Sequence, residues 1–381
     1  MTEVTPREWL EATKSHGMQL GLERVNEALE ALGRPDKQMS CIQVAGSNGK
    51  GSACSQLVAG LCQAGYNVGL FSSPHIARIE ERIRVNGKPI DSESFDKALM
   101  LIKELEIQLT FFEITYIASL IICSNNEMQI MILETGLGGR YDATSSAEVI
   151  GCLVTSISFE HSDILGETLE DIAREKAAIW RPGVPMLVRD PCIPRIRNAI
   201  REEAISARFW NPESGNAMDE AGDLAEVLCK MLGLEFERRM PKWPARMQYV
   251  EGTPSILLDA AHNPSGMLRI IPEISEKLPK KWSLLFGTSP QIDMKLFLQP
   301  LFELMIENPP QEIITTEPQG GRYAGVVQPI SEVVHISNPE EAIQAFRLEC
   351  DMILIVGSLY LCGNILTYLG LDTDEDLDIL S

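Results

Sequence analysis

Short apolar segments alternate with amphipathic segments along most of the chain. Runs of five or six mostly apolar residues, typical of buried strands, fall at 41–45, 68–72, 130–135, 152–157 and 184–188. Segments whose apolar residues recur with helical spacing predict helices at 51–64, 93–106, 111–124, 168–180 and 217–232. Strands that alternate with helices predict an α/β fold, with a mostly parallel sheet covered by helices.

This alternation is interrupted at 241–248, PKWPARMQ, where two prolines flank a tryptophan. It then resumes with the apolar runs SILLDAA, WSLLFGT, EIITTE and DMILIVGS. A chain of 381 residues is also long for a single hydrophobic core. We therefore predict a larger domain at 1–240, a linker at 241–248 and a smaller α/β domain at 249–381.

The composition, 45% hydrophobic and 23% charged, is that of a globular protein, and no apolar run approaches the length of a membrane span. The N-terminal residues lack the basic and apolar regions of a signal peptide. Nine cysteines form no C-x-x-C pair, which argues against a disulfide framework or a structural zinc site. We expect a cytoplasmic, monomeric protein with reduced thiols.

The formal net charge of −21 argues against nucleic acid or an anionic membrane as a partner, because phosphate groups require clustered Lys and Arg. Small anionic substrates are compatible with this charge, since they need only a locally positive pocket. The last eleven residues, LDTDEDLDILS, carry five acids. We expect this tail to be solvated.

The segment GSNGKGS, 46–52, follows the first predicted strand and opens a predicted helix. It departs from the usual phosphate loop, because Gly51 separates Lys50 from Ser52 and Val44 stands where the first glycine is expected. Glycines allow a close approach to an anion, and the helix start directs N–H groups toward it. The strand-loop-helix context favours a nucleotide site over a plain glycine-rich turn.

Two further segments place oxygen ligands after predicted strands. In FSSPHIARIEERIRV, Ser72 and Ser73 end a strand, and a hydroxyl there suits Mg²⁺, although a solvated charged loop is the simpler interpretation. In LETGLGGRYDATS, Glu134 ends an apolar strand, and a buried carboxylate there needs a partner such as a metal ion. A surface strand end remains the alternative.

Histidines mark two other strand ends. His161 follows the strand at 152–157, and Lys176 comes fifteen residues later beside small and apolar residues. From the residues alone, Lys176 is expected to extend to solvent rather than to be buried with a lowered pKa. In LLDAAHNPSGM, Asp259 could bind a ribose hydroxyl and His262 could contact a nucleotide.

Together these segments resemble the folylpolyglutamate synthase/dihydrofolate synthase family of the Mur ligase superfamily. The resemblance runs from LGLERV (20–25) to GSLYLCGNIL (357–366). It implies a central P-loop nucleotide-binding domain and a smaller C-terminal Rossmann-like domain. The cofactors implied are ATP and Mg²⁺.

The resemblance also implies roles for individual residues. The phosphate loop matches at Gly46, Ser47, Asn48, Gly49, Lys50, Gly51 and Ser52. The implied metal ligands are Ser52, Ser73, Glu134, His161 and Lys176, with Lys176 carbamylated, and the implied catalytic residues are Lys50, His161 and Lys176. ATP contacts in or near the C-terminal domain fall on Asn216, Arg246, Asp259 and His262, and substrate contacts on Leu22, Glu23, Arg24, Arg82, Thr115, Tyr141, Asp142 and Ala143.

This sequence departs from the family pattern in several places. Ser47 replaces Thr, Glu160 replaces the Asp before His161, EKAGI is EKAAI and PGR is PAR. The stretch between Lys176 and Asn216 is shorter than usual, which affects the substrate side more than the ATP site.

The function implied is an ATP-dependent ligase that adds L-glutamate to dihydropteroate, to folates or to both, through an acyl phosphate. One alternative is another amide ligase of the superfamily, such as a muramyl-peptide synthetase. A second alternative is a nucleotide-binding module without ligase activity.

Overall fold

The computed structural model describes residues 4–17, 19, 21–213, 215–321, 323–325, 333–347 and 349–381. The chain divides into two compact units, Met1–Lys242 with Asp378–Ser381, and Trp243–Leu377. This division differs from the sequence-based boundaries in two respects. Residues 243–248 belong to the second unit rather than to a separate linker, and the last four residues return to the first unit.

Among the described residues, the first unit contains an eight-stranded sheet in the order β4-β3-β2-β5-β1-β6-β7-β8. The pairs formed by β2 with β3 and by β3 with β4 are antiparallel, and the others are parallel. The strands are β1 Ser40–Ala45, β2 Val68–Phe71, β3 Ile83–Val85, β4 Lys88–Pro89, β5 Ile130–Glu134, β6 Val149–Val154, β7 Met186–Arg189 and β8 Arg208–Trp210.

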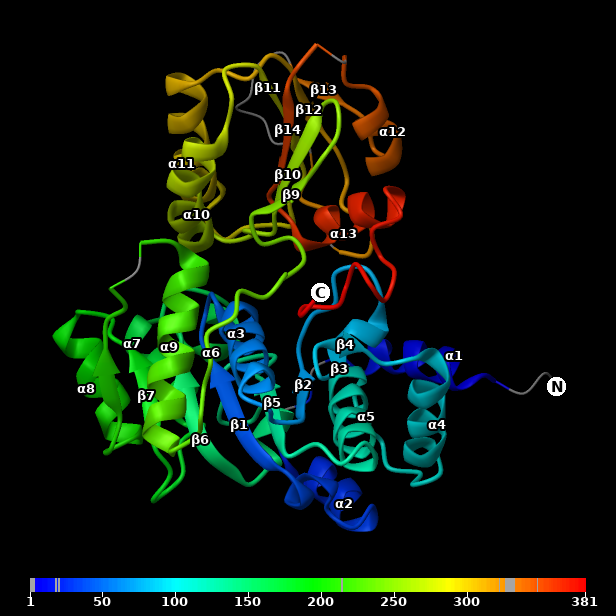
Figure 1. Ribbon diagram of the computed structural model, residues 1–381, viewed down its shortest axis with the longest axis vertical. Helices are drawn as coiled ribbons and strands as arrows, with labels where there is room; N and C mark the ends of the chain where they lie inside the picture. Colours follow the sequence, from blue (N-terminus) through cyan, green and yellow to red (C-terminus); the bar gives the residue numbers. More distant parts are fainter. Residues whose placement is uncertain are drawn as a thin grey trace. The chain divides into compact units, whose positions relative to one another are not determined.

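The helices of this unit connect and cover the strands (Figure 1). They are α1 Pro6–Ala12, α2 Glu23–Ala31, α3 Lys50–Gln63, α4 Ser92–Lys103, α5 Phe111–Asn125, α6 Ser162–Leu165, α7 Leu169–Ala177, α8 Pro194–Glu203 and α9 Ala217–Leu232. Short 3-10 turns are η1 Thr13–His16, η2 Pro35–Gln38, η3 Ile79–Arg82 and η4 Ala143–Ser146. Helix α3 packs beside α9 and against β1, β2 and β5, so the phosphate loop leads into a buried helix.

The strands described in the second unit form a six-stranded sheet in the order β13-β12-β11-β14-β10-β9, in which β9 is antiparallel. They are β9 Gln248–Val250, β10 Ser255–Asp259, β11 Trp282–Phe286, β12 Ile313–Thr315, β13 Val334–His335 and β14 Met352–Val356. The helices are α10 Pro264–Lys277, α11 Met294–Glu307, α12 Pro339–Gln344 and α13 Leu359–Tyr368. Each unit has its own apolar core.

The predicted α/β fold is confirmed, and each predicted strand and helix occurs, most with ends shifted by a few residues and the helix at 217–232 with the predicted bounds. The clearest shift concerns the strand predicted at 152–157, which ends at Val154. Beyond Val154, polar groups of Thr155, Ser156 and Ser158 bond to the phosphate loop. None of the described helices is long and apolar enough to cross a membrane.

The prediction of a solvated C-terminal tail is wrong for its last residues. Leu377 and Ile379 are buried. The N–H of Ile379 donates to the carbonyl of Gly87 at 3.2 Å, and the N–H of Lys242 donates to the carbonyl of Ile379 at 3.0 Å. Apolar residues between the tail acids therefore fix the chain end in the first unit.

Candidate active site

The phosphate loop joins the end of β1 to the start of α3. Gly46 and Gly49 have φ values of 149° and 83°, in the region that favours glycine. A Cβ atom on Gly46 would clash with the hydroxyl of Thr155. Gly49 is the N-cap of α3 and has no side chain to cap it, so the first-turn N–H groups face outward toward a potential anion.

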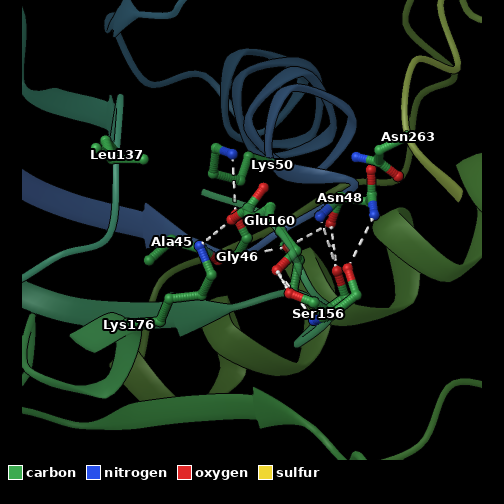
Figure 2. A network of polar contacts seen from close by, with 12 residues as sticks. Ala45, Gly46, Asn48, Lys50, Leu137, Ser156, Glu160, Lys176 and Asn263 are labelled. Carbon is green, nitrogen blue, oxygen red and sulfur yellow. Dashed lines mark hydrogen bonds and ion pairs between the residues drawn. The ribbon is translucent and has the colours of Figure 1, made fainter. Parts of the chain in front are cut away.

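Residues 155–158 clamp the phosphate loop. Thr155 and Ser156 donate their hydroxyl groups to the carbonyl of Asn48, at 2.7 and 2.9 Å, and the Ser156 hydroxyl accepts the N–H of Asn48 at 2.8 Å. Ser47 donates its hydroxyl to the carbonyl of Ser158 and accepts the N–H of the same residue, both at 3.0 Å. The loop is therefore preorganised by protein contacts (Figure 2).

Lys50 lies at the first turn of α3, and its Nζ donates to the carbonyl of Gly46 at 2.9 Å. This contact folds the ammonium group back over the loop (Figure 2), where a phosphate would compete for it. Ser52, two residues after Lys50 in the first turn of α3, is buried. Both side chains border the loop, as the sequence predicts.

Glu134 lies beside this loop, because β5 is the neighbour of β1 and Glu134 pairs in register with Val44. It is only 5% exposed. Its Oε2 accepts the N–H of Ser73 at 3.0 Å, which joins the end of β5 to the segment that follows β2. The structure therefore brings the predicted metal ligands Ser73 and Glu134 together.

Lys176 does not extend to solvent, so the interpretation drawn from the residues alone is wrong. Its side chain on α7 is buried, 1% exposed, and its Nζ donates to Oε1 of Glu160 (Figure 2). Burial lowers the pKa of Lys176, an effect that Glu160 opposes and Lys50 reinforces. Helix α7 starts at a capping box formed by Thr168 and Asp171, and Lys176 lies one turn after Ile172 on its buried face.

The contact between Glu160 and Lys176 is the main feature of this site that was not predicted from the sequence. Glu160 is noticeable in the sequence only as a departure from the family pattern. Burial raises the pKa of Glu160, but Lys50 and Lys176 outweigh that effect and lower it. His161, the next residue, is exposed at the N-cap of α6, with a φ of 44°.

The donor set suits Mg²⁺ held together with a phosphate group. No cluster of three or more His, Cys, Asp or Glu side chains in the described part of the chain could hold a metal ion alone. Glu134 supplies a carboxylate, and Ser52 and Ser73 supply hydroxyl groups beside the phosphate loop. Mg²⁺ commonly binds through one or two carboxylates plus water and substrate phosphates, so these residues fit it.

The first of the proposed substrate residues lie on or near α2 and α5. Arg24, two residues after Leu22, pairs with Glu113 at 2.9 Å, and Glu113 also closes the capping box at the start of α5. Thr115, on the same helix, is buried, and its hydroxyl donates to the carbonyl of Phe112 at 3.0 Å. The hydroxyl of Thr115 is therefore already hydrogen-bonded within α5.

The contacts of Asp142 give its side chain a structural role. Its carboxylate is buried and accepts the N–H groups of Gly136, Leu137 and Thr144, at 2.8, 2.9 and 3.0 Å. Burial raises its pKa despite these bonds. The side chain fixes the turn after β5, while neighbouring Tyr141 is 51% exposed and Ala143 is buried.

Arg82 is buried beside aromatic and imidazole groups. Its Nε donates to Nδ1 of His75 at 2.9 Å, and its guanidinium lies 5.2 Å from the ring centre of Phe111. Burial, and then Arg82, lower the pKa of His75 to about 4, which keeps the ring neutral near pH 7. Glu23 begins α2, next to Arg24.

The predicted ATP contacts outside the phosphate loop have their own local partners. Asn216, the N-cap of α9, accepts the N–H of Asp219 at 2.8 Å. In the second unit, Asp259 accepts the N–H groups of Met247 and Ala261, at 3.0 and 2.9 Å, and burial raises its pKa although Arg246 opposes this. His262 is exposed, and its Nδ1 contacts the carbonyl of Ala260 at 2.8 Å.

Comparisons with known proteins agree with this fold. The chain is 31% identical over 326 residues to the dihydrofolate synthase/folylpolyglutamate synthase of Bacillus subtilis, covering 71% of this chain and 76% of that relative. It resembles E. coli FolC in complex with DHPP and ADP, with a TM-score of 0.86, 26% identity and coverage of 96% of this chain and 98% of that one.

A second solved structure, a bifunctional folylpolyglutamate synthase/dihydrofolate synthase with Mn, AMPPNP and L-glutamate bound, gives a TM-score of 0.85 at 26% identity, over 97% of this chain and 99% of that one. No family model matches the chain.

Proposed function

The chain belongs to the dihydrofolate synthase/folylpolyglutamate synthase family, and from this premise we propose that its first unit carries the chemistry of an ATP-dependent glutamate ligase. The reaction joins the amine of L-glutamate to a carboxylate of dihydropteroate or of a folate. The observation that supports this most directly is the preorganised phosphate loop beside the Ser73–Glu134 pair.

A carboxylate must be activated before an amine can displace one of its oxygens. Transfer of the γ-phosphoryl group of ATP gives an acyl phosphate, the amine attacks its carbonyl carbon, and inorganic phosphate leaves. The N–H groups of the loop and Lys50 bind the phosphates and stabilise charge on the transferring group. Lys50 is placed for this because its Nζ already spans the loop.

We assign four side chains to divalent cations bound with ATP, namely those of Ser52, Ser73, Glu134 and His161. Such a cation neutralises charge on phosphate oxygens during transfer. The role of Glu134 is to present its carboxylate at the end of β5, where Ser73 holds it at 3.0 Å. His161, exposed next to Glu160, is assigned to a second cation.

We assign a carbamate to Lys176, formed with CO₂. Burial lowers the pKa of this lysine, which favours the neutral amine that adds CO₂. Attack of the Nζ lone pair on carbon forms the N–C bond, and the released proton passes to Glu160 or to solvent. The product is a carboxylate next to Lys50 and Glu160.

The remaining proposals concern the cellular compartment, the class of substrate and the oligomeric state. All nine cysteines are free, which supports the reducing cytoplasm as its compartment. The net charge of −21 supports small-molecule substrates rather than nucleic acid. A monomer remains our expectation for the oligomeric state.

Release of phosphate from ATP tests this function. We expect turnover that requires Mg²⁺, L-glutamate and either dihydropteroate or a folate, with a glutamylated product seen by mass spectrometry. Omission of each component in turn should abolish it. Phosphate release that does not depend on L-glutamate or on a pteroate would contradict the assignment and favour a nucleotide-binding module. Turnover with a muramyl peptide instead would favour the superfamily alternative.

A further inference from the structure

A buried acid–base pair lies outside the groups assigned to catalysis. Glu81 in η3 and Arg84 in β3 are both 2% exposed, and Nη2 of Arg84 lies 3.5 Å from Oε2 of Glu81. Desolvating two charges costs several kcal/mol, which their attraction offsets only in good geometry. An apolar pair would pack the same space at lower cost, so the pair calls for a role beyond packing.

The contacts of this pair converge on one segment, residues 72–77. Oε1 of Glu81 accepts the N–H groups of Ile76 and of Ala77, the latter at 2.7 Å. Arg84 donates to the Ser72 hydroxyl at 3.5 Å and to the carbonyl of Glu81. The pair therefore holds both ends of the segment.

The start of the same segment carries one proposed metal ligand, Ser73, and contacts another, Glu134. Ser73 donates its N–H to Glu134 at 3.0 Å, and Ser72 donates its N–H to the carbonyl of Arg82 at 2.8 Å. Burial lowers the pKa of Arg84, whereas Glu81, Asp378 and Glu134 favour its charge. Arg84 is thus electrostatically coupled to the carboxylate of Glu134 as well as to Glu81.

We propose that Glu81, held by Arg84, is a positioning residue that fixes segment 72–77 so that Ser73 and Glu134 present their oxygens to the same divalent cation. Glu81 does not touch the cation. It acts through the two backbone N–H groups that it binds, which set the path of the chain after Pro74. The inference rests on the proposed function of this edge of the sheet.

The test compares Glu81→Gln with Glu80→Gln. Glu80 is a matched control, since it is 5% exposed in the same 3-10 turn but bonds to Arg7 at 2.7 Å and Ser92 at 2.9 Å, away from the segment. Partners that orient metal ligands typically change metal affinity about 10- to 100-fold. We expect Glu81→Gln to raise the Mg²⁺ concentration for half-maximal turnover about 10-fold and Glu80→Gln to leave it unchanged.

Amide hydrogen exchange gives a second readout that does not depend on turnover. In Glu81→Gln, the neutral amide oxygen is a weaker acceptor than the carboxylate, and the NH2 group must face Nη2 of Arg84 in place of Oε2. The amides of Ile76, Ala77 and Ser73 should therefore exchange faster than in the parent, and in Glu80→Gln they should not. A Mg²⁺ response that shifts equally in both variants, or unchanged exchange at Ser73, would overturn the proposal. A parent without turnover would overturn the proposed function alone, because exchange still reports how the segment is held.

Glu81→Asp separates positioning from charge and serves if Glu81→Gln does not fold. It keeps the negative charge beside Arg84 but shortens the side chain by one methylene, so it cannot reach both N–H groups. We expect the Mg²⁺ response of Glu81→Asp to resemble that of Glu81→Gln. A parent-like response would show that Glu81 only neutralises Arg84 and would overturn the positioning role.

Discussion

Each unit ends a buried strand in an acid, and the two acids are held in different ways. Glu134 is the last residue of β5 and Asp259 the last residue of β10, and they are 5% and 2% exposed. Asp259 accepts N–H groups of Met247 and Ala261 with separate oxygens. Glu134 accepts the N–H of Ser73, which follows a neighbouring strand.

The difference teaches that an acid at a strand end is not by itself a sign of chemistry. Asp259 binds the N–H of the residue before β9 and an N–H just after β10, so its first role is structural. Glu134 links the ends of two parallel strands at the edge that also carries the phosphate loop. Ligands of α/β sheets bind at such edges. We therefore expect substitutions in the two places to separate activity from stability.

The largest expected effect belongs to Lys50→Ala at the edge that carries Glu134. Loss of one preorganised charge donor costs about 10²- to 10³-fold in turnover, and loss of phosphate binding should add to this. Lys97→Ala, at an exposed surface pair with Glu93, is the matched control and should be neutral. Steady-state turnover and thermal unfolding should show inactivity with an intact fold. Parent-like turnover would contradict the phosphate-loop assignment.

Glu134→Gln is expected to lower turnover about 10²-fold, because the amide keeps the shape but loses the charge that a cation needs. The Ser73 N–H can still donate to the amide oxygen, so we expect little change in the melting temperature. Titration of Mg²⁺ in the phosphate-release assay should show a weaker response. If turnover and the Mg²⁺ requirement both match the parent, Glu134 is a structural acid like Asp259.

Lys176→Ala should cost about 10-fold or more in turnover, since it removes the proposed carbamate and its negative charge. Acetate or another short carboxylate should restore part of the activity by filling the vacated space. With ¹³C-bicarbonate, the parent should show a carbamate carbon resonance that Lys176→Ala lacks and Lys97→Ala retains. The same spectrum in the parent and in Lys176→Ala would rule out carbamylation there.

Asp259→Asn tests the other side of the comparison. The amide nitrogen must face the N–H of Met247 or of Ala261, which leaves a buried donor unpaired and costs about 1–3 kcal/mol. We expect a lower melting temperature, a KM for ATP raised by less than about 10-fold and nearly unchanged turnover at saturation. A loss of turnover as large as that of Glu134→Gln would make the two acids equivalent.

The smallest effect on activity is expected from deletion of residues 378–381. Their removal takes away the buried side chain of Ile379 and exposes the surface that it covers. It also deletes the backbone hydrogen bonds of Ile379 to Gly87 and Lys242. Burial of an isoleucine contributes about 1.5–3 kcal/mol, so the melting temperature should fall by a few degrees. Turnover below the melting transition should change less than about fivefold. An unchanged melting temperature would mean that the tail does not stabilise the first unit.

Much of the site followed from local sequence. The glycines of 46–52 require backbone torsions that few other residues adopt, and they stand between a strand and a helix, so the loop was predictable. The contact of Glu160 was not, because Glu160 lies in the loop after β6 and its partner Lys176 lies on α7, sixteen positions away. Asp142 was proposed to contact substrate, yet its carboxylate accepts three N–H groups of its own turn.

The sequence by itself determined the α/β alternation, the break near residue 242 and the phosphate loop, because periodicity and glycine torsions act over a few residues. Only the tertiary structure decided that Lys176 is buried, that Glu81 and Arg84 pair, and that Ile379 returns to the first unit. Burial and charge pairing depend on residues brought together from distant positions, as in the contact between Ser73 and Glu134, 61 positions apart. Those pairings set which polar side chains are held in place and which can meet a ligand.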